Sequence, residues 1–213
     1  MKKFTYKYSQ PEEYRFSLDS IEMPLLVARY LQGSPNLPSD LKVLDLCAGC
    51  GVIGFELHFH YRKIAQVDFV EVQSVYNSHF ELNRDQVQES TKSDTQFKFL
   101  NLNYDQLLAE DFFEAYDLVV CNPPYFEVDQ GRLSPSDFKN RCRFYMDSDF
   151  ETLVRVLGHV IRPSGMAYLL LRPLSEHKKD LLSRLRSLLP TGIQMEVVGD
   201  VRGTFLVRLL KPA

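Results

Sequence analysis

The sequence predicts an α/β fold in which helices cover both faces of a mostly parallel sheet of seven strands. Short apolar segments that suit buried strands alternate with longer segments of helical periodicity through most of the 213 residues. A glycine-rich turn follows the first strand, as is typical of a strand-to-helix connection. The last two strands are joined by Gly199–Gly203, which predicts a closing antiparallel hairpin.

The chain begins with a segment that precedes the sheet. A helix is predicted over Ser17–Gln32, with Asp19 or Ser20 as its cap, Pro24 near its first turn and Gly33 just beyond its end. Two prolines in the following residues indicate a connector. We therefore expect one domain, made of an N-terminal helical segment over residues 1–40 and a core over residues 41–213.

The core contains the remaining elements in alternating order. Strands are predicted at Lys42–Leu46, Lys63–Glu71, Phe97–Leu100, Asp117–Cys121, Met166–Leu171, Gln194–Val198 and Thr204–Leu210. Helices are predicted from the glycine turn to about Tyr61 and at Ser74–Val87, Asp105–Glu110, Phe150–Ile161 and Glu176–Leu189. The residues between Cys121 and Phe150 are predicted to form a loop through Tyr145.

Composition limits the class of protein. No apolar run approaches the roughly 18 residues of a membrane span, and no apolar signal sequence follows Lys2 and Lys3. The four cysteines lack a disulfide-type spacing, which favours a reduced, cytoplasmic protein. Residues 1–120 hold 11 Lys and Arg against 18 Asp and Glu, whereas residues 121–213 hold 14 against 10. The second half therefore suits a polyanionic partner or an ordinary solvated surface.

The glycine turn, Cys47–Gly54, contains Gly49-x-Gly51-x-x-Gly54 and lets the backbone approach a ligand. Glu71 ends the next strand, where a carboxylate suits the two hydroxyls of a ribose. The turn alone does not distinguish a dinucleotide from S-adenosylmethionine. Asp45 is available for the ammonium group of the latter or for capping the turn. Cys47-x-x-Cys50 lacks a second cysteine or histidine pair, so no metal site is predicted.

The fourth strand ends at Asn122-Pro123-Pro124-Tyr125, here called the asparagine corner. Its prolines interrupt strand pairing and hold the chain extended. The Asn122 amide oxygen and the Pro123 carbonyl can accept the two hydrogens of a planar amine, on which Tyr125 can stack. Such positioning suits transfer of a methyl group to nitrogen. By itself the tetrapeptide is also compatible with a simple turn, and its place beside the glycine turn favours the functional interpretation.

Longer motifs carry a family resemblance. The stretches VLDLCAGCGVIG (43–54), VEVQSVYNSHFELN (70–83) and NPPYF (122–126) resemble class I S-adenosylmethionine-dependent methyltransferases of the amino-methylating group. The resemblance implies a Rossmann-like sheet and S-adenosylmethionine as the cofactor. YRFSLDSIEMPLLVARYL (14–31) and NRCRF (140–144) resemble bacterial tRNA adenine-N6 methyltransferases, which modify the adenine beside the anticodon of valine tRNA. The acceptor implied is therefore RNA, and within RNA a tRNA.

The same resemblance assigns residues. Asn122, Pro123 and Tyr125 are expected to be catalytic, and Asp45, Gly49, Gly51 and Glu71 to bind the cofactor. The family often places an aspartate at the end of the third strand to bind the adenine of the cofactor, whereas this chain has Asn101 and Asn103, of which we assign Asn103. Substrate contacts are expected from Pro124, Phe126, Arg132, Lys139, Arg141 and Arg143. The four basic residues lie in Gly131–Tyr145, either a lid that contacts RNA or an ordinary surface loop.

Other functions remain to be distinguished. Methyltransferases acting on glutamine in translation release factors share the corner, but they usually continue with Glu-Pro and a glycine-rich segment, unlike residues 126–129 here. A non-catalytic nucleic-acid-binding module would lose the cofactor residues, and a dehydrogenase would leave the corner unexplained. The oligomeric state is not predicted.

Overall fold

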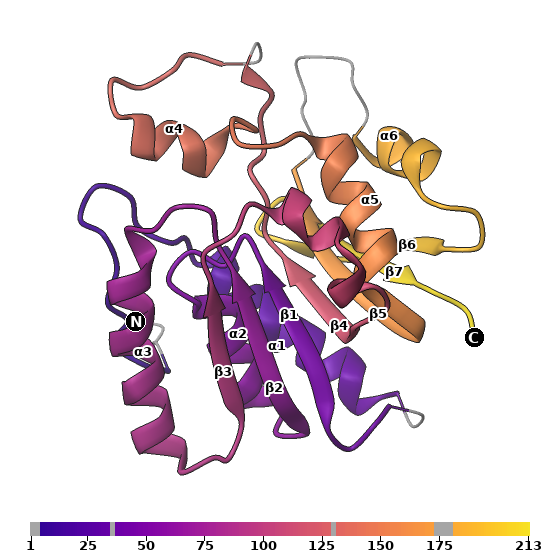
Figure 1. Ribbon diagram of the computed structural model, residues 1–213, viewed down its shortest axis with the longest axis horizontal. Coiled ribbons are helices and arrows are strands. Elements are labelled where there is room, and N and C mark those ends of the chain that lie inside the picture. The colour runs from indigo at the N-terminus through magenta and orange to yellow at the C-terminus, as the bar shows by residue number, and fades with distance from the viewer. Residues whose placement is uncertain (1–4, 35–36, 129–130, 173–180) are drawn as a thin grey trace.

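A sheet with strand order β3-β2-β1-β4-β5-β7-β6 forms the centre of the structure (Figure 1). The computed structural model describes residues 5–34, 37–128, 131–172 and 181–213. Its strands are β1 (Leu41–Leu46), β2 (Ile64–Val70), β3 (Gln96–Leu100), β4 (Tyr116–Cys121), β5 (Ile161–Leu171), β6 (Gln194–Val201) and β7 (Thr204–Leu210). The first five strands are parallel, and β7 is antiparallel to both β5 and β6. The predicted seven-stranded fold with its closing hairpin is confirmed.

Helices cover both faces of the sheet. They are α1 (Asp19–Gln32), α2 (Val52–His60), α3 (Tyr76–Thr91), α4 (Asp137–Arg143), α5 (Phe150–Val160) and α6 (Leu181–Leu188). One hydrophobic cluster joins α1, α2 and α3 to the sheet, and a second joins α5 and α6 to the other face. Neighbouring strand residues therefore serve opposite cores, as Val119 and Val120 do in β4. This two-sided burial explains why the central strands are continuously apolar.

Several boundaries differ from the sequence prediction. The strand β5 begins at Ile161, five residues before the predicted Met166, because Ile161 already pairs with Tyr116 ahead of an irregularity at which Ser164 has a φ of 64°. Pro24 lies inside α1 rather than near its first turn. The predicted helix at 105–110 is two short 3₁₀ segments, Tyr104–Leu108 and Glu110–Phe112. The beginning of the predicted helix Glu176–Leu189 lies outside the described residues.

The helix α4 lies in a segment that was predicted to be a loop. It has only seven residues, too few to give a clear helical period. Its first turn is capped by Ser136, whose hydroxyl accepts a hydrogen bond from the Lys139 amide at 3.4 Å. In Figure 1, α4 lies beyond the carboxyl ends of the strands, apart from the helices that cover the sheet.

The strand order changes direction between β1 and β4, which are adjacent parallel strands. Leu46 pairs with Cys121 at their carboxyl ends. The glycine turn and the asparagine corner therefore leave the sheet from neighbouring points. Crevices at such switch points are the usual ligand sites of open α/β sheets.

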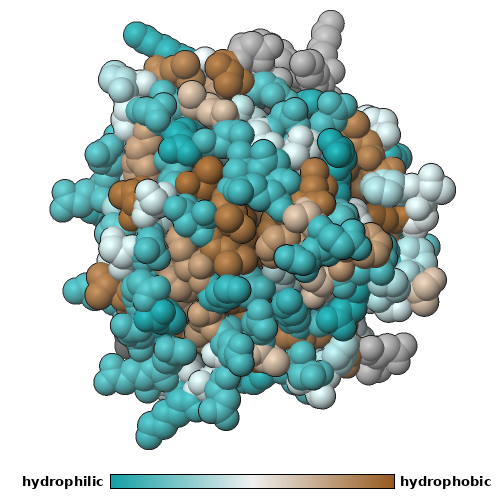
Figure 2. Space-filling model, viewed as in Figure 1, coloured by the Kyte–Doolittle hydropathy of each residue, from teal (hydrophilic) through white to brown (hydrophobic). Residues whose placement is uncertain are grey.

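The surface is largely polar on the face shown in Figure 2, where hydrophobic side chains form smaller patches among hydrophilic ones. None of the helices in the described ranges combines the length and apolar character needed to cross a membrane.

The N-terminal residues are fastened to the helices behind the glycine turn. The Asn83 carboxamide, 1% exposed, accepts a hydrogen bond from the Ser9 amide at 2.7 Å. It also donates to the Ser9 and Cys50 carbonyls, both at 3.0 Å. A second link comes from Tyr8, whose hydroxyl donates to buried Glu56 at 2.8 Å. One side chain of α3 thus connects the N-terminal segment to the glycine turn.

Asn83→Ala should lower the free energy of unfolding by about 2–4 kcal/mol, because buried donor and acceptor groups lose their partners. Denaturant unfolding followed by circular dichroism measures this change. Asn77→Ala is the matched control, since Asn77 lies on the same helix and is exposed. Equal stability of the two variants would contradict the role assigned to Asn83.

Candidate functional site

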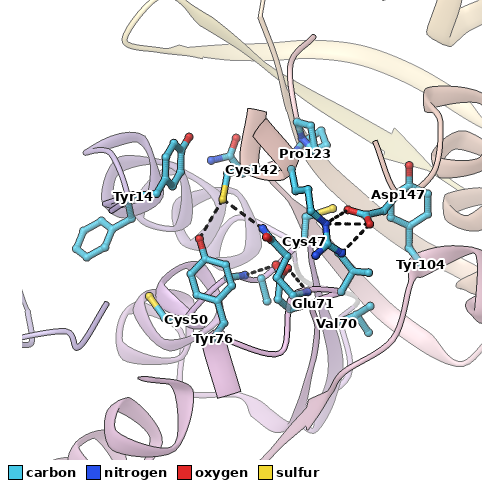
Figure 3. A pocket seen from close by; sticks show the side chains of 18 of the residues that line it. Tyr14, Cys47, Cys50, Val70, Glu71, Tyr76, Tyr104, Pro123, Cys142 and Asp147 are labelled. Atoms are coloured by element: carbon cyan, nitrogen blue, oxygen red, sulfur yellow. Dashed lines mark hydrogen bonds and ion pairs between the residues drawn. The ribbon is translucent and has the colours of Figure 1, made fainter. Parts of the chain in front are cut away.

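A cavity of about 170 Å³ lies at the carboxyl edge of the sheet, and Figure 3 shows the side chains around it. Its wall includes residues of the N-terminal segment, the glycine turn, the end of β2, the segment after β3, the asparagine corner and the stretch that begins with Arg141. The elements on which the sequence predicted ligand binding and catalysis therefore meet around one space.

The predicted site residues fall into two groups. Eight line the cavity: Gly49, Glu71, Asn103, Asn122, Pro123, Pro124, Tyr125 and Arg141. Six lie outside its wall: Asp45, Gly51, Phe126, Arg132, Lys139 and Arg143.

The glycine turn owes its shape to three residues in the left-handed region. Cys47, Gly49 and Gly51 have φ values of 61°, 54° and 87°. A Cβ at position 51 would lie 2.7 Å from the Phe55 ring, so both backbone and packing require glycine there. Gly49, by contrast, has the cavity on one side and the Tyr76 ring nearby. Cys47 adopts a conformation that costs a non-glycine residue about 1 kcal/mol or more.

Glu71 is the acidic group of the cavity wall. Its Oε2 accepts a hydrogen bond from the Gly49 amide and its Oε1 accepts one from the Gln73 amide, each at 2.9 Å. Burial raises the pKa of Glu71, and the two amides oppose this shift. Because each carboxylate oxygen can accept two hydrogen bonds, capacity for two hydroxyl groups remains. Glu71 thus both fixes the turn and can bind a diol.

Asp45 lies beneath the glycine turn. Its Oδ2 accepts a hydrogen bond from the Gly54 amide at 2.8 Å, whereas its Oδ1 has no partner among the described residues. Burial raises the pKa of Asp45 to about 7, the Gly54 amide lowers it, and the charge of Glu71 raises it further. This geometry favours the capping role over direct contact with a ligand.

The asparagine corner is held at its backbone and at its side chains. The amides of Tyr125 and Phe126 both donate to the Arg143 carbonyl at 3.1 Å, and the Tyr145 amide donates to the Phe126 carbonyl at 2.9 Å. The Tyr125 hydroxyl donates to Asn122 Oδ1 at 2.5 Å. Burial raises the pKa of Tyr125, so its hydroxyl is protonated at neutral pH.

The helix α4 closes one side of the cavity. Arg141 Nε lies 3.0 Å from both carboxylate oxygens of Asp147, and Arg141 Nη2 lies 2.6 Å from Oδ1. Cys142 Sγ accepts a hydrogen bond from Gln73 Nε2 and lies 3.3 Å from the Tyr76 hydroxyl (Figure 3). The predicted lid segment is therefore partly a wall of the cavity.

The basic residues of this segment have different surroundings. Arg141 faces the cavity, whereas Arg132 and Arg143 are exposed and Lys139 is half-buried. The Arg143 guanidinium lies 5.8 Å from the centre of the Phe126 ring and 5.7 Å from that of Phe144. Only Arg141 is in a position to act on the contents of the cavity.

Asn103 occupies the end of the cavity near Asp147. Its side chain caps the following 3₁₀ segment by accepting from the Asp105 amide at 3.5 Å, and it donates to the Asp147 carbonyl at 2.7 Å. Asn101 instead donates to the carbonyls of Glu71 and Val72 at 2.8 and 3.1 Å. Asn101 is not part of the wall.

Sequence reasoning missed the N-terminal contribution to the wall, which comes from Gln10, Tyr14, Phe16, Ser17 and Ser20. Their polar and aromatic side chains, just before and at the beginning of the first predicted helix, were the available signal. In the described part of the chain, no three His, Cys, Asp or Glu side chains are grouped so that they could hold a metal ion.

Comparisons with known proteins identify a family for this chain. Residues 26–134 match the family model described as "Methyltransferase small domain". The tRNA1(Val) (adenine(37)-N6)-methyltransferase of Cytophaga hutchinsonii is 28% identical over 149 residues, covering 64% of this chain and 54% of that protein. The enzyme of the same name from Shewanella putrefaciens is 26% identical over 188 residues, covering 86% and 73%. The chain spans about half the length of several curated relatives it matches.

Solved structures share the fold at low sequence identity. TrmN from Thermus thermophilus has a TM-score of 0.55 at 19% identity, covering 88% of this chain and 48% of that one. Ribosomal protein L11 methylase from Lactobacillus delbrueckii subsp. bulgaricus has a TM-score of 0.59 at 11% identity, covering 96% and 84%.

The raised pKa of Asp45 predicts a pH-dependent stability. Between about pH 4 and pH 7 the folded state binds more protons than the unfolded state, so the stability due to this group falls as pH rises. Asp45→Asn removes the charge and retains an acceptor for Gly54. Relative to wild type, its free energy of unfolding should rise by roughly 2–3 kcal/mol between pH 5 and pH 8. Urea unfolding at several pH values measures this.

The control for this experiment is Asp40→Asn, which removes an exposed carboxylate just before β1. Its difference from wild type should stay nearly constant with pH. A constant difference for Asp45→Asn as well would show that Asp45 is charged in the folded protein throughout this range.

Proposed function

Because this chain belongs to the methyltransferase small domain family, we propose that it transfers a methyl group from S-adenosylmethionine to N6 of adenine in a tRNA. The observation that carries the proposal is that the glycine turn, Glu71 and the asparagine corner line the same cavity. A ligand bound at the turn therefore lies within reach of a group held at the corner. The relatives named as tRNA adenine-N6 methyltransferases support the acceptor. A tRNA acceptor implies action in the cytoplasm.

The residues present fit the cofactor. Glu71 offers carboxylate oxygens to the ribose hydroxyls, and the open side of Gly49 admits the cofactor to the turn. Asn103 and Asp147 stand at the end of the cavity proposed for the adenine. Asp45 contributes from beneath by fixing the first turn of α2. When bound, S-adenosylmethionine supplies a methyl group on a sulfonium centre.

The asparagine corner suits a planar amine as the acceptor. The lone pair of such a nitrogen is delocalised into the ring, so the amine is a weak nucleophile. Asn122 Oδ1 and the Pro123 carbonyl accept its two hydrogens and favour a pyramidal nitrogen, whose lone pair is then free to attack. The Pro123 carbonyl is well suited because Pro124 has no amide hydrogen. No general base is required, since the methylated nitrogen is cationic and loses its proton to a carbonyl or water.

The outer surface of α4 and the preceding residues is the proposed RNA contact. Arg132, Lys139 and Arg143 lie outside the cavity wall, the first in the residues before α4 and the other two within it. Arg143 packs over Phe126, so a charged group and an aromatic ring are presented together. This combination suits the phosphates and unstacked bases of an anticodon loop. The positive balance of residues 121–213 is consistent with that role.

Incubation with labelled S-adenosylmethionine and total RNA, followed by nucleoside mass spectrometry, tests the proposal. N6-methyladenosine should form with the wild type. Asn122→Ala should lower the rate at least about 100-fold, because it removes an acceptor used in the transition state. Binding of S-adenosylhomocysteine by the variant should be unchanged, which confirms that it is folded. If the label appeared in release factors and not in RNA, the acceptor would be a protein glutamine and not adenine.

Charge-reversal variants distinguish the residues proposed to contact RNA from the one that lines the cofactor cavity. The double variant Arg132→Glu and Arg143→Glu should weaken RNA binding and reduce its dependence on salt by about two phosphate contacts. Its affinity for S-adenosylhomocysteine should not change. Arg141→Glu should instead weaken S-adenosylhomocysteine binding about tenfold, because two adjacent acids would force the cavity wall apart. Titration calorimetry measures the affinity for S-adenosylhomocysteine, and filter binding measures the affinity for RNA. If the double variant lost S-adenosylhomocysteine binding and Arg141→Glu lost RNA binding, the roles assigned to these residues would have to be exchanged.

A further inference from the structure

The amide of an asparagine has two faces that differ in chemistry. Rotation by 180° about its last side-chain bond exchanges an acceptor oxygen for a donor nitrogen at nearly the same position. At the asparagine corner the difference is decisive, since a donor facing an amine would repel it. Some contact must therefore select the orientation of Asn122 before the acceptor arrives.

The structure contains such a contact. The Tyr125 hydroxyl donates to Asn122 Oδ1 at 2.5 Å, and the two side chains close a loop across Pro123 and Pro124. Burial raises the pKa of Tyr125, so the proton remains available for this bond. If the amide were reversed, its NH2 group would face the hydroxyl, and the proton that the hydroxyl donates to Oδ1 would lose that acceptor. Both side chains are partly buried, so losing this hydrogen bond is costly and the orientation with oxygen toward the hydroxyl is favoured.

Tyr125 is itself fixed at a second point. Its amide donates to the Arg143 carbonyl at 3.1 Å, and the neighbouring Phe126 amide shares that acceptor. Two prolines restrict the backbone between Asn122 and Tyr125. The hydroxyl is therefore held by the fold, and it does not depend on a bound ligand for its position.

We propose that the Tyr125 hydroxyl is a positioning group that holds the Asn122 amide with its oxygen as the acceptor for the substrate amine. This inference rests on the proposed function and adds a role that ring stacking does not supply. An amide oxygen can accept two hydrogen bonds, so one from Tyr125 leaves one for the substrate. In this proposal the ring of Tyr125 stacks on the substrate base, and its hydroxyl orients the Asn122 amide.

Tyr125→Phe tests the proposal because it keeps the ring and removes the hydroxyl. We expect kcat to fall about tenfold, which corresponds to the loss of one hydrogen bond to a group used in the transition state. KM for RNA should stay within about twofold because stacking is retained. Affinity for S-adenosylhomocysteine and the thermal midpoint should remain close to wild type.

The Asn122→Asp background gives the sharper comparison. A carboxylate has two equivalent oxygens, so reversal no longer presents a donor. In this background Tyr125→Phe should change kcat by less than about twofold. An equal loss of kcat in both backgrounds would overturn the proposal, as would an unchanged kcat for Tyr125→Phe alone.

Tyr116→Phe is the matched control. Tyr116 lies at the opposite end of β4, and its buried hydroxyl donates to Asp68 at 2.8 Å. This variant should lower the thermal midpoint and leave kcat unchanged. If the wild type transfers no methyl group to RNA, the proposed function fails and this inference fails with it. If the wild type is active and Tyr125→Phe is equally active, only the inference fails.

Discussion

The pairing of β1 with β4 is the constraint on which the site depends. Leu46 lies opposite Cys121, and these two residues are the last of their strands. Each ends for a local reason, one in residues with positive φ and the other in two prolines. Because the strands are parallel, both interruptions fall at the same edge of the sheet. This register therefore places a turn with left-handed backbone residues and a proline-restricted corner beside the same cavity.

Electrostatics adds a second constraint. Asp45 and Glu71 are both buried, and the loss of hydration makes their charged forms less stable, which raises the pKa of each. Amides of Gly49, Gln73 and Gly54 offset part of this cost while fixing the turn. The two acids therefore have the same structural task, and Glu71 alone also faces the cavity.

Most of the fold and part of the site followed from the sequence. Strand positions were predictable because two-sided burial produces continuous apolar segments, and the glycine turn and asparagine corner have residue types that few other structures require. The helix α4 was not predictable, since its seven residues are stabilised by contacts of Cys142 and Phe138 with Tyr76 of α3 and by the Arg141–Asp147 pair. Asp45 lies beneath the turn, and Gln10 and Tyr14 lie in the cavity wall. These positions also depend on tertiary contacts, which no local sequence pattern encodes.

The contacts of α4 connect two parts of the cavity wall. Near its C-terminal end Cys142 contacts Gln73 and Tyr76, and just beyond that same end the Tyr145 amide is hydrogen-bonded to the Phe126 carbonyl. The last turn of α4 therefore links the side of the cavity near the glycine turn to the asparagine corner. A shift of this last turn would therefore move the wall beside the glycine turn and the wall at the corner together.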